Sequence, residues 1–339
     1  MSPRARLVLA GILTLLLLGG ASAYGVVEIA AYRSRLAAPS QVRTTGTAPD
    51  TANQARIVFR NTATGAGYGR VASVPIARPG GTRTVTDLTC DRVYETVSRT
   101  MCLRIDRGIV TTFSATLLDK AGVVQRSWGL PGIPSRTRIA PDSSLVAFTS
   151  FVTGTSYATV GFSTATFIAS VDGRDYGNLE SFALTVEGRP VTSLDRNFWG
   201  VTFTADDNIF YATAASGGRT WLVRGDLAAR TLTSLRQGAE CPSISPDGSR
   251  IAYKKNVSTS AIAYWSIAVL NLKTGEEAVL PEKRNVDDQV LWLDDSTILY
   301  GLPTADQPGD SDIWAIPSDG STGARPFIEH AWSPSVVRP

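Results

Sequence analysis

A short hairpin pattern that returns along the chain is the feature that most limits how this sequence can fold. Residues 245–255 read SPDGSRIAYKK, and residues 139–150 read IAPDSSLVAFTS, which aligns with them without a gap. The stretches FTADDNIFYAT at 203–213 and WLDDSTILYG at 292–301 fit the pattern with one residue deleted. Each predicts two short strands joined by a tight turn. An Asp in each turn can accept hydrogen bonds from backbone N–H groups just ahead of it; these structural turn residues are Asp142, Asp206, Asp247 and Asp294.

Third strands follow these hairpins and set the architecture. Six of them occur, at spacings of about 40–55 residues, which is the range of propeller repeats. They cover residues 71–81, 112–122, 166–173, 220–230, 265–275 and 312–320. A weaker fourth strand follows most of them, and four strands per repeat are typical of a β-propeller blade. The sequence therefore predicts an all-β, six-bladed β-propeller. Seven blades is the alternative, because residues 151–192 could hold an extra hairpin.

The two ends of the repeat region predict how the ring closes. RIVFRN at 56–61 resembles the second strand of a blade, so the first blade lacks its innermost strand. The C-terminal SPSVVRP resembles CPSISPD at 241–247 without its hairpin partner. We expect residues 333–337 to close the ring as the inner strand of the first blade, which removes the exposed edges of an open array.

The N-terminus predicts export. MSPRAR is followed by an uncharged run at residues 7–27, which we expect to form an apolar helix. With the small residues ASA at 21–23, it fits a secretory signal cleaved after Ala23. Its length also fits a retained transmembrane anchor. Both interpretations stay open, and both keep Arg4 and Arg6 inside and export the rest. The predicted organisation is a signal peptide or anchor at 1–35, a flexible linker at 36–54 and the propeller at 55–339.

Cysteines in an exported chain favour a disulfide. Cys90 and Cys102 lie in CDRVYETVSRTMCLR, two strand-like runs joined near residue 96. Hairpin symmetry about that residue places the two sulfur atoms opposite each other and predicts a bridge, the alternative being two buried thiols. Cys241 is then expected to be a buried free thiol.

The repeated SPDGSxIAY hairpin, with third strands of the form W/A-x-L-x-x-x-x-G, resembles the TolB-type propeller repeats, which are related to WD-type repeats. The resemblance covers about residues 55–339 and is greatest to the exported or membrane-anchored TolB-like proteins of actinobacteria. TolB carries an α/β domain before its propeller, where this chain has only the linker. The resemblance implies protein–protein binding without chemistry. We therefore expect a non-catalytic, extracytoplasmic, monomeric scaffold with no cofactor, whose partner is an unidentified protein of the cell envelope.

Composition and residue types exclude some functions. The net charge is only +3, and Lys and Arg are scattered along the chain, so nucleic-acid binding is not expected. The single histidine, His330, and three unsuitably spaced cysteines do not predict a zinc site.

Loops that link one blade to the next supply the candidate site. Arg-Asn occurs at both 196–197 and 284–285, in such loops. Polar side chains that meet there would form a concave binding mouth around the channel. The candidates are Asn197, Trp199, Glu240, Asn285, Asp287 and Asp288.

Three alternatives compete with partner binding at these residues. The Arg and Asn side chains could instead hydrogen-bond the neighbouring blade. A metal-dependent hydrolase or lactonase could hold calcium or magnesium through the Asp, Glu and Asn candidates. Trp199 is the feature that would favour a glycan-binding module.

Overall fold

The computed structural model describes residues 3–46, 54–108, 110–152 and 163–339. The described residues within Met1–Val42 and Ala63–Tyr68 form one compact unit, and those within Arg43–Thr62 and Gly69–Pro339 form another.

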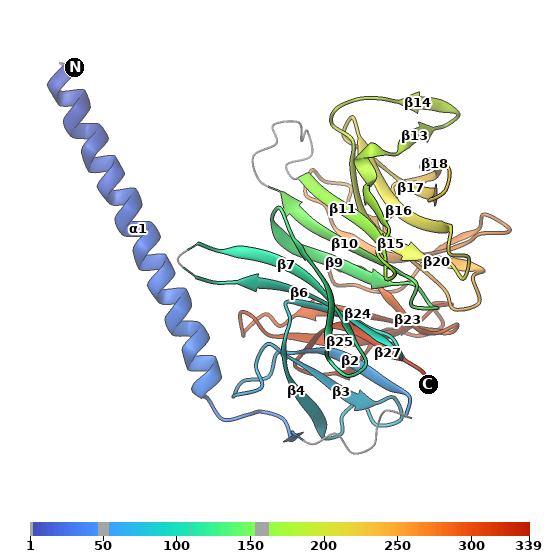
Figure 1. The fold of residues 1–339 in the computed structure, drawn as a ribbon, viewed down its shortest axis with the longest axis horizontal. Coiled ribbons are helices and arrows are strands. Elements are labelled where there is room, and N and C mark those ends of the chain that lie inside the picture. Colours follow the sequence, from blue (N-terminus) through green and yellow to red (C-terminus); the bar gives the residue numbers. More distant parts are fainter. Residues whose placement is uncertain (1–2, 47–53, 109, 153–162) are drawn as a thin grey trace. The chain divides into compact units, whose positions relative to one another are not determined.

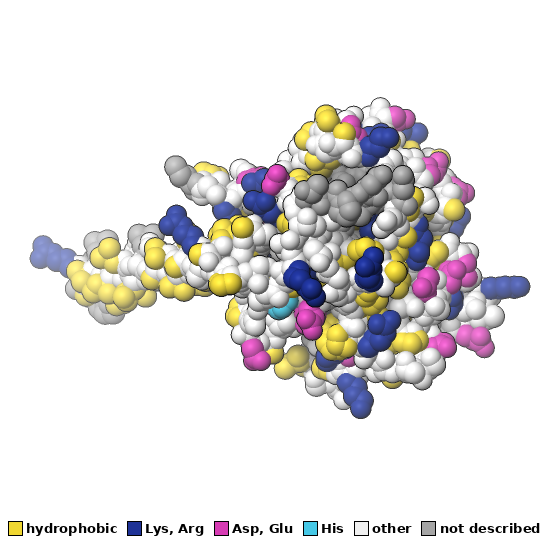
Figure 2. All heavy atoms as spheres, turned by 90° about the horizontal axis from the view of Figure 1, so that it is seen from below, with side chains coloured by type: hydrophobic (Ala, Val, Ile, Leu, Met, Phe, Trp, Pro, Cys, Tyr) yellow, Lys and Arg dark blue, Asp and Glu magenta, His cyan; other side chains and the backbone are white. Residues whose placement is uncertain are grey.

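The first unit consists of a long apolar helix and a short loop. Helix α1 (Pro3–Ala37) is the one helix, among the residues described, that is long and apolar enough to cross a membrane (Figure 1). Hydrophobic side chains cover much of its surface (Figure 2). Near its C-terminal end, the backbone N–H of Gly65 donates to the carbonyl of Arg35 at 2.7 Å. Arg35 donates to the Tyr68 hydroxyl at 3.1 Å. The residues at 63–68 therefore hold the end of the helix.

The second unit contains six blades, each built around four antiparallel strands. From its inner to its outer strand, blade 1 has β27 (Ala331–Val337), β2 (Arg56–Asn61), β3 (Arg70–Pro75), β4 (Arg83–Thr89) and the short β1 (Thr44–Thr45). In the same inner-to-outer order, blade 2 has β5 (Arg92–Glu95), β6 (Arg99–Asp106), β7 (Thr112–Asp119) and β8 (Val124–Gly129). Blade 3 has β9 (Ile133–Ile139), β10 (Leu145–Val152), β11 (Ser163–Ser170) and β12 (Asp175–Asn178).

The other three blades follow in chain order (Figure 1). Blade 4 has β15 (Asn197–Phe203), β16 (Ile209–Ser216), β17 (Arg219–Asp226), β18 (Thr231–Gln237), β13 (Ala183–Val186) and β14 (Arg189–Val191). Blade 5 has β19 (Glu240–Ile244), β20 (Arg250–Asn256), β21 (Trp265–Asn271) and β22 (Glu277–Val279). Blade 6 has β23 (Leu291–Asp294), β24 (Thr297–Pro303), β25 (Ser311–Pro317) and β26 (Arg325–Ile328).

The six-bladed prediction is confirmed, and so is the closing strand. Strand β27 pairs antiparallel with β2, and Arg56 lies opposite Val337. Apolar side chains then pack between the faces of neighbouring blades. Ile57 and Phe59 of β2 and Leu299 of β24, for example, belong to one buried cluster that joins blades 1 and 6. The first and last strands of the repeat region thus share one sheet.

The long stretch at 151–192 does not form a seventh blade. A short 3-10 helix, η1 (Leu179–Ser181), leads into the β13–β14 hairpin, and β13 pairs parallel with β18. The hairpin therefore widens blade 4 to six strands. Residues 153–162 of this stretch lie outside the described part of the chain.

Part of the predicted linker at 36–54 has regular structure. Helix α1 continues to Ala37, and Thr44 and Thr45 of β1 pair parallel with Arg83 and Thr84 of β4. The outer edge of blade 1 is therefore extended by the segment that precedes it. Residues 47–53 of the linker are outside the described residues.

The four Asp residues hold the turns as predicted. In each turn a carboxylate oxygen accepts from the backbone N–H two residues ahead. The distances are 3.0 Å for Asp142, 2.8 Å for Asp206, 3.0 Å for Asp247 and 2.9 Å for Asp294. Serine hydroxyls and the Ser249 N–H stabilise the charged form of Asp247 and lower the pKa of that carboxyl to about 2.

The predicted disulfide is present, but hairpin symmetry is not the reason for it. The sulfur atoms of Cys90 and Cys102 are 2.00 Å apart. Cys102 lies in β6 opposite Val93 of β5, so Cys90 precedes the hairpin rather than facing its other strand. Cys90 instead follows β4, and the bridge ties the link between blades 1 and 2 to the second strand of blade 2. Cys241 is a buried free thiol, as predicted.

We expect reduction of this bridge to destabilise the propeller modestly, because the closed loop is short. The bonded residues are 12 apart in sequence, which corresponds to a loss of about 2–3 kcal/mol in the free energy of unfolding. The measurement is a thermal melt with and without reductant. In a Cys90→Ser/Cys102→Ser variant the reductant should have no further effect, and an equal shift in that variant would contradict the assignment.

Candidate functional site

One end of the central channel opens into a wide cavity, which we call the mouth cavity. Its volume is about 450 Å³. It lies where the inner strands end and turn into the second strands, so the Asp-containing turns of blades 3 and 5 are at its rim. All six blades contribute to its wall, which includes Tyr94, Val97, Ile139, Pro141, Phe203, Ile244, Pro246, Leu291, Trp292 and Val336. The wall is thus mainly apolar.

Few polar groups in the mouth cavity remain available, because most are fixed by the protein. The Trp292 indole N–H donates to the Ser243 carbonyl at 2.8 Å, and Arg338 donates to the Leu293 carbonyl at 2.7 Å. The guanidinium of Arg138 lies 5.1 Å from the centre of the Tyr94 ring. Burial raises the pKa of the Tyr94 phenol, and Arg138 partly opposes this. The phenol is therefore neutral at physiological pH.

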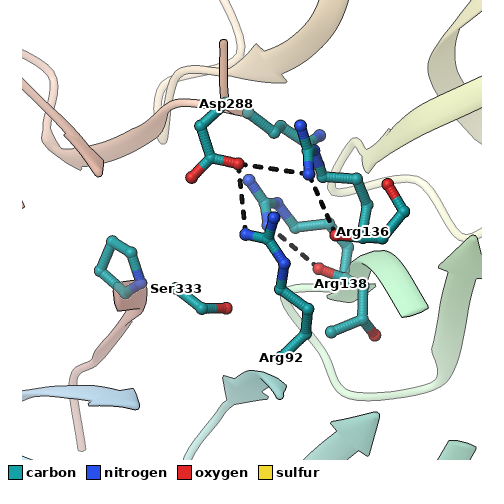
Figure 3. Close-up of a pocket in the computed structure, with 9 residues that line it drawn as sticks. Arg92, Arg136, Arg138, Asp288 and Ser333 are labelled. Atoms are coloured by element: carbon teal, nitrogen blue, oxygen red, sulfur yellow. Dashed lines mark hydrogen bonds and ion pairs between the residues drawn. The ribbon is translucent and has the colours of Figure 1, made fainter. Parts of the chain in front are cut away.

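Deeper in the channel lies a second, narrow cavity of about 10 Å³, room for about one molecule of the size of water. Its wall carries Arg92, Arg136, Arg138 and Asp288, which we call the central cluster (Figure 3). Asp288 lies 3.3 Å from the Nη1 atom of Arg92 and 3.4 Å from that of Arg136. Arg138 donates instead to the Val290 carbonyl at 3.0 Å. Two guanidinium groups thus pair with one carboxylate, and the third lies beside them in the wall of the same cavity.

Burial changes the acidity of the arginines in the central cluster. It lowers the pKa of Arg92 to about 10, although Asp288 works in the opposite direction. Burial also lowers the pKa of Arg138, against the opposing effects of Tyr94 and Asp288. For Arg136, burial is outweighed by nearby groups, chiefly Asp288, and the pKa rises. The charge of Arg136 is therefore better compensated by its surroundings than the charges of Arg92 and Arg138.

Two of the six site residues predicted from the sequence, Asn197 and Asn285, do not line the mouth cavity and hydrogen-bond nearby strands instead. The Asn197 side chain is buried, and its Oδ1 atom accepts from the Thr164 N–H of blade 3 at 2.9 Å. The Oδ1 atom of Asn285 accepts from the Trp265 N–H of blade 5 at 2.7 Å. The Asn197 contact joins blade 4 to blade 3 and agrees with the alternative in which such side chains bond the neighbouring blade, whereas the Asn285 contact holds its loop to the blade that precedes it.

The other four candidates differ in exposure. Trp199 is buried and packs with Ala215 and Cys241. Glu240 is buried 3.7 Å from Lys254, which also pairs with Asp287. Asp288 is buried in the central cluster, whereas the Asp287 side chain is 63% exposed. The structure thus brings Glu240 and Asp287 together around Lys254, and a binding role for the exposed Asp287 stays a prediction.

A metal-dependent enzyme would need several carboxylate or amide oxygens arranged around one ion. Within residues 3–46, 54–108, 110–152 and 163–339, no group of three or more His, Cys, Asp or Glu side chains is arranged to hold a metal ion. Among the candidate residues, the carboxylates of Glu240 and Asp287 are both paired with the ammonium group of Lys254, which takes the place that a cation would need.

The arginines of the central cluster were not among the residues predicted from the sequence. Arg136 and Arg138 alternate in IPSRTRI, the inner strand of blade 3. Two charged residues in an innermost strand are unusual, since long cationic side chains are seldom buried. This alternation is the sequence signal that could have identified them.

A second polar cluster joins blade 6 to blade 1. The Nδ1 atom of His330 lies 2.6 Å from a carboxylate oxygen of Asp310. The other oxygen of Asp310 accepts from the Thr62 hydroxyl at 2.6 Å. Arg83 donates to the His330 carbonyl at 2.8 Å. The cluster thus fastens the loop just before the closing strand.

We expect the stability of the ring to depend on pH through His330. The hydrogen bond to Asp310 raises the pKa of the imidazole, while burial and Arg83 oppose this. The stabilisation is complete below the unfolded pKa of about 6.5. It is lost as the pH rises through the raised pKa of the folded protein. It should amount to no more than about 1.5 kcal/mol, because the ring is partly exposed.

The measurement is the free energy of unfolding between pH 6 and 9, in the wild type and in His330→Gln. The variant should be less stable at pH 6 and should show a flatter pH dependence in this window. Since His330 is the only histidine, an unchanged pH dependence in the variant would contradict the assignment.

Six sheets arranged in a closed ring around a central channel define the protein as a six-bladed β-propeller. The chain matches no protein-family model and no curated protein. Among solved structures, it is similar to TolB from Acinetobacter baumannii, with a TM-score of 0.56 and 17% identity over 87% of this chain and 69% of that one. It is also similar to a chain of the nidogen/laminin complex, with a TM-score of 0.55 and 11% identity over 83% of this chain and 98% of that one. These similarities show a TolB-like β-propeller fold.

Proposed function

We propose that this protein is a non-catalytic, extracytoplasmic binding module that receives a segment of a partner protein in its mouth cavity. The observation that carries the proposal is the cavity itself. Its volume of about 450 Å³ falls within the range of roughly 300–1,000 Å³ that is common for ligand sites. Its wall combines apolar side chains from all six blades with backbone turns.

The mouth cavity is suited to binding because its frame is rigid. The rim turns at Asp142 and Asp247 are fixed by their own carboxylates, so they lose little conformational freedom when a ligand binds. Val97 is 50% exposed, which gives an apolar side chain in reach of an incoming segment. Binding residues carried by loops on a rigid scaffold are a common arrangement.

An extracytoplasmic location is supported by the N-terminus and the disulfide. Helix α1 is long and apolar enough to anchor the chain, and Arg4 and Arg6 precede its apolar part. The Cys90–Cys102 bridge suits an oxidising compartment. In the proposal the partner is a protein of the cell envelope. The propeller is tethered through residues 7–27, or released from the membrane if the chain is cleaved after Ala23.

The test is in-cell photo-crosslinking of the full-length protein, with the crosslinking residue placed at Val97 in the mouth cavity. The matched control is Val124, a similarly exposed valine in the outer strand β8, at 57% exposure against 50% for Val97. A third position, Asp287, tests the loop candidate. We expect one envelope protein to be crosslinked from Val97 and not from Val124.

Two results would count against the proposal. Equal adducts from Val97 and Val124 would indicate nonspecific contact. Adducts from Asp287 alone would move the binding surface away from the mouth cavity to the loops that link the blades.

A further inference from the structure

The central cluster carries more positive charge than its surroundings neutralise. Arg92, Arg136 and Arg138 face the single carboxylate of Asp288 (Figure 3). Arg60 adds positive potential at Arg92. Two other carboxylates, those of Glu240 and Asp287, are paired with Lys254, although Asp287 also acts on Arg136 from a greater distance than Asp288. A buried surplus of charge is costly unless a counter-charge is supplied.

Hydrogen bonding in the narrow cavity is also incomplete. The buried Nε atom of Arg136, a donor, and the buried Oε1 atom of Gln289, an acceptor, have no partner among the described residues. Both residues line this cavity. The amide orientation of Gln289 is fixed, since its Nε2 atom donates to the Pro242 carbonyl at 2.8 Å. Leaving a charged donor buried without a partner costs more than leaving a neutral one.

We propose that the narrow cavity is a binding site for one small monovalent anion, either chloride or the carboxylate group of a ligand. Guanidinium groups bind such anions through charge-assisted hydrogen bonds, and the Nε–H of Arg136 is available to donate one. The anion completes the charge balance that Asp288 begins. A volume of about 10 Å³ leaves room for one chloride ion or one carboxylate oxygen, which are only moderately larger than a water molecule or similar to it, and not for a polyatomic anion as a whole.

The site does not depend on the proposed partner, but it adjoins the surface proposed to bind it. Arg138 lines both the narrow cavity and the mouth cavity. A carboxylate carried by a ligand in the mouth cavity is therefore a second source of the same chemistry. A free ion and a ligand's carboxylate would both be bound by the guanidinium groups of the same three arginines.

The test is a thermal melt of the full-length protein in detergent, at equal ionic strength, in sodium chloride, sodium formate or sodium methanesulfonate. Methanesulfonate has no carboxylate, and its sulfonate group is larger than a carboxylate, so it serves as the reference salt. An anion that binds only the folded state raises the melting temperature with its concentration. We expect chloride, formate or both to raise it by a few degrees above the methanesulfonate value.

Two substitutions in the central cluster should change the affinity for the anion in opposite directions. Arg136→Gln removes the donor with no partner and should weaken the apparent affinity for the anion by at least about tenfold. Asp288→Asn removes the competing carboxylate and should strengthen the affinity by about tenfold. The matched control is Arg104→Gln on β6, whose side chain is 52% exposed, and it should behave as the wild type.

The possible outcomes separate clearly. Stabilisation by formate alone assigns the site to a ligand's carboxylate, and stabilisation by chloride alone assigns it to a free ion. The proposal is overturned if the three salts give equal melting temperatures in both the wild type and Asp288→Asn. It is equally overturned if Arg136→Gln keeps the full shift, which would be a general salt effect. Asp288→Asn keeps the test decisive if Arg136→Gln does not fold.

Discussion

The pairing of β27 with β2 is the interaction on which the rest of the propeller depends. It joins the last strand of the chain to the first complete strand of the repeat region. Without it, blade 1 would present an open inner edge to the channel, and blade 6 would lose the surface that covers its apolar face. The buried cluster that contains Ile57, Phe59 and Leu299 exists only because the ring is closed. The His330–Asp310 contact fastens the loop that leads into this strand.

Closure also creates the channel and decides what can lie in it. Arg92, Arg136 and Asp288 come from three different parts of the chain and meet only because inner strands and linking loops converge on one axis. At the wide end, the inner strands give way to turns, so the wall becomes apolar and open. At the narrow end, charged side chains fill most of the space. One channel therefore offers an apolar site next to a strongly cationic one.

Much of this fold could be predicted because a repeat is visible locally. The turn aspartates at Asp142, Asp206, Asp247 and Asp294 form short-range hydrogen bonds that depend only on their immediate neighbours. The disulfide was predicted correctly for the wrong reason, since strand register depends on the whole sheet and Cys102 pairs with Val93. The candidate site was predicted less well. Asn197 bonds a strand of the neighbouring blade, Asn285 fastens its own loop to blade 5, and the arginines of the central cluster were not predicted at all.

The sequence by itself determined the blade pattern, the closing strand, the turn residues and the apolar N-terminal helix, and it favoured six blades without excluding seven. Each of these follows from periodicity or from contacts between residues close in the chain. Only the tertiary structure decided which side chains line the channel, that Asp288 is buried between arginines while Asp287 is exposed, and that the mouth cavity is apolar. The physical reason is that a channel wall is assembled from residues that are far apart in sequence. Their burial, charge balance and free hydrogen-bonding atoms are set by neighbours that no local pattern identifies.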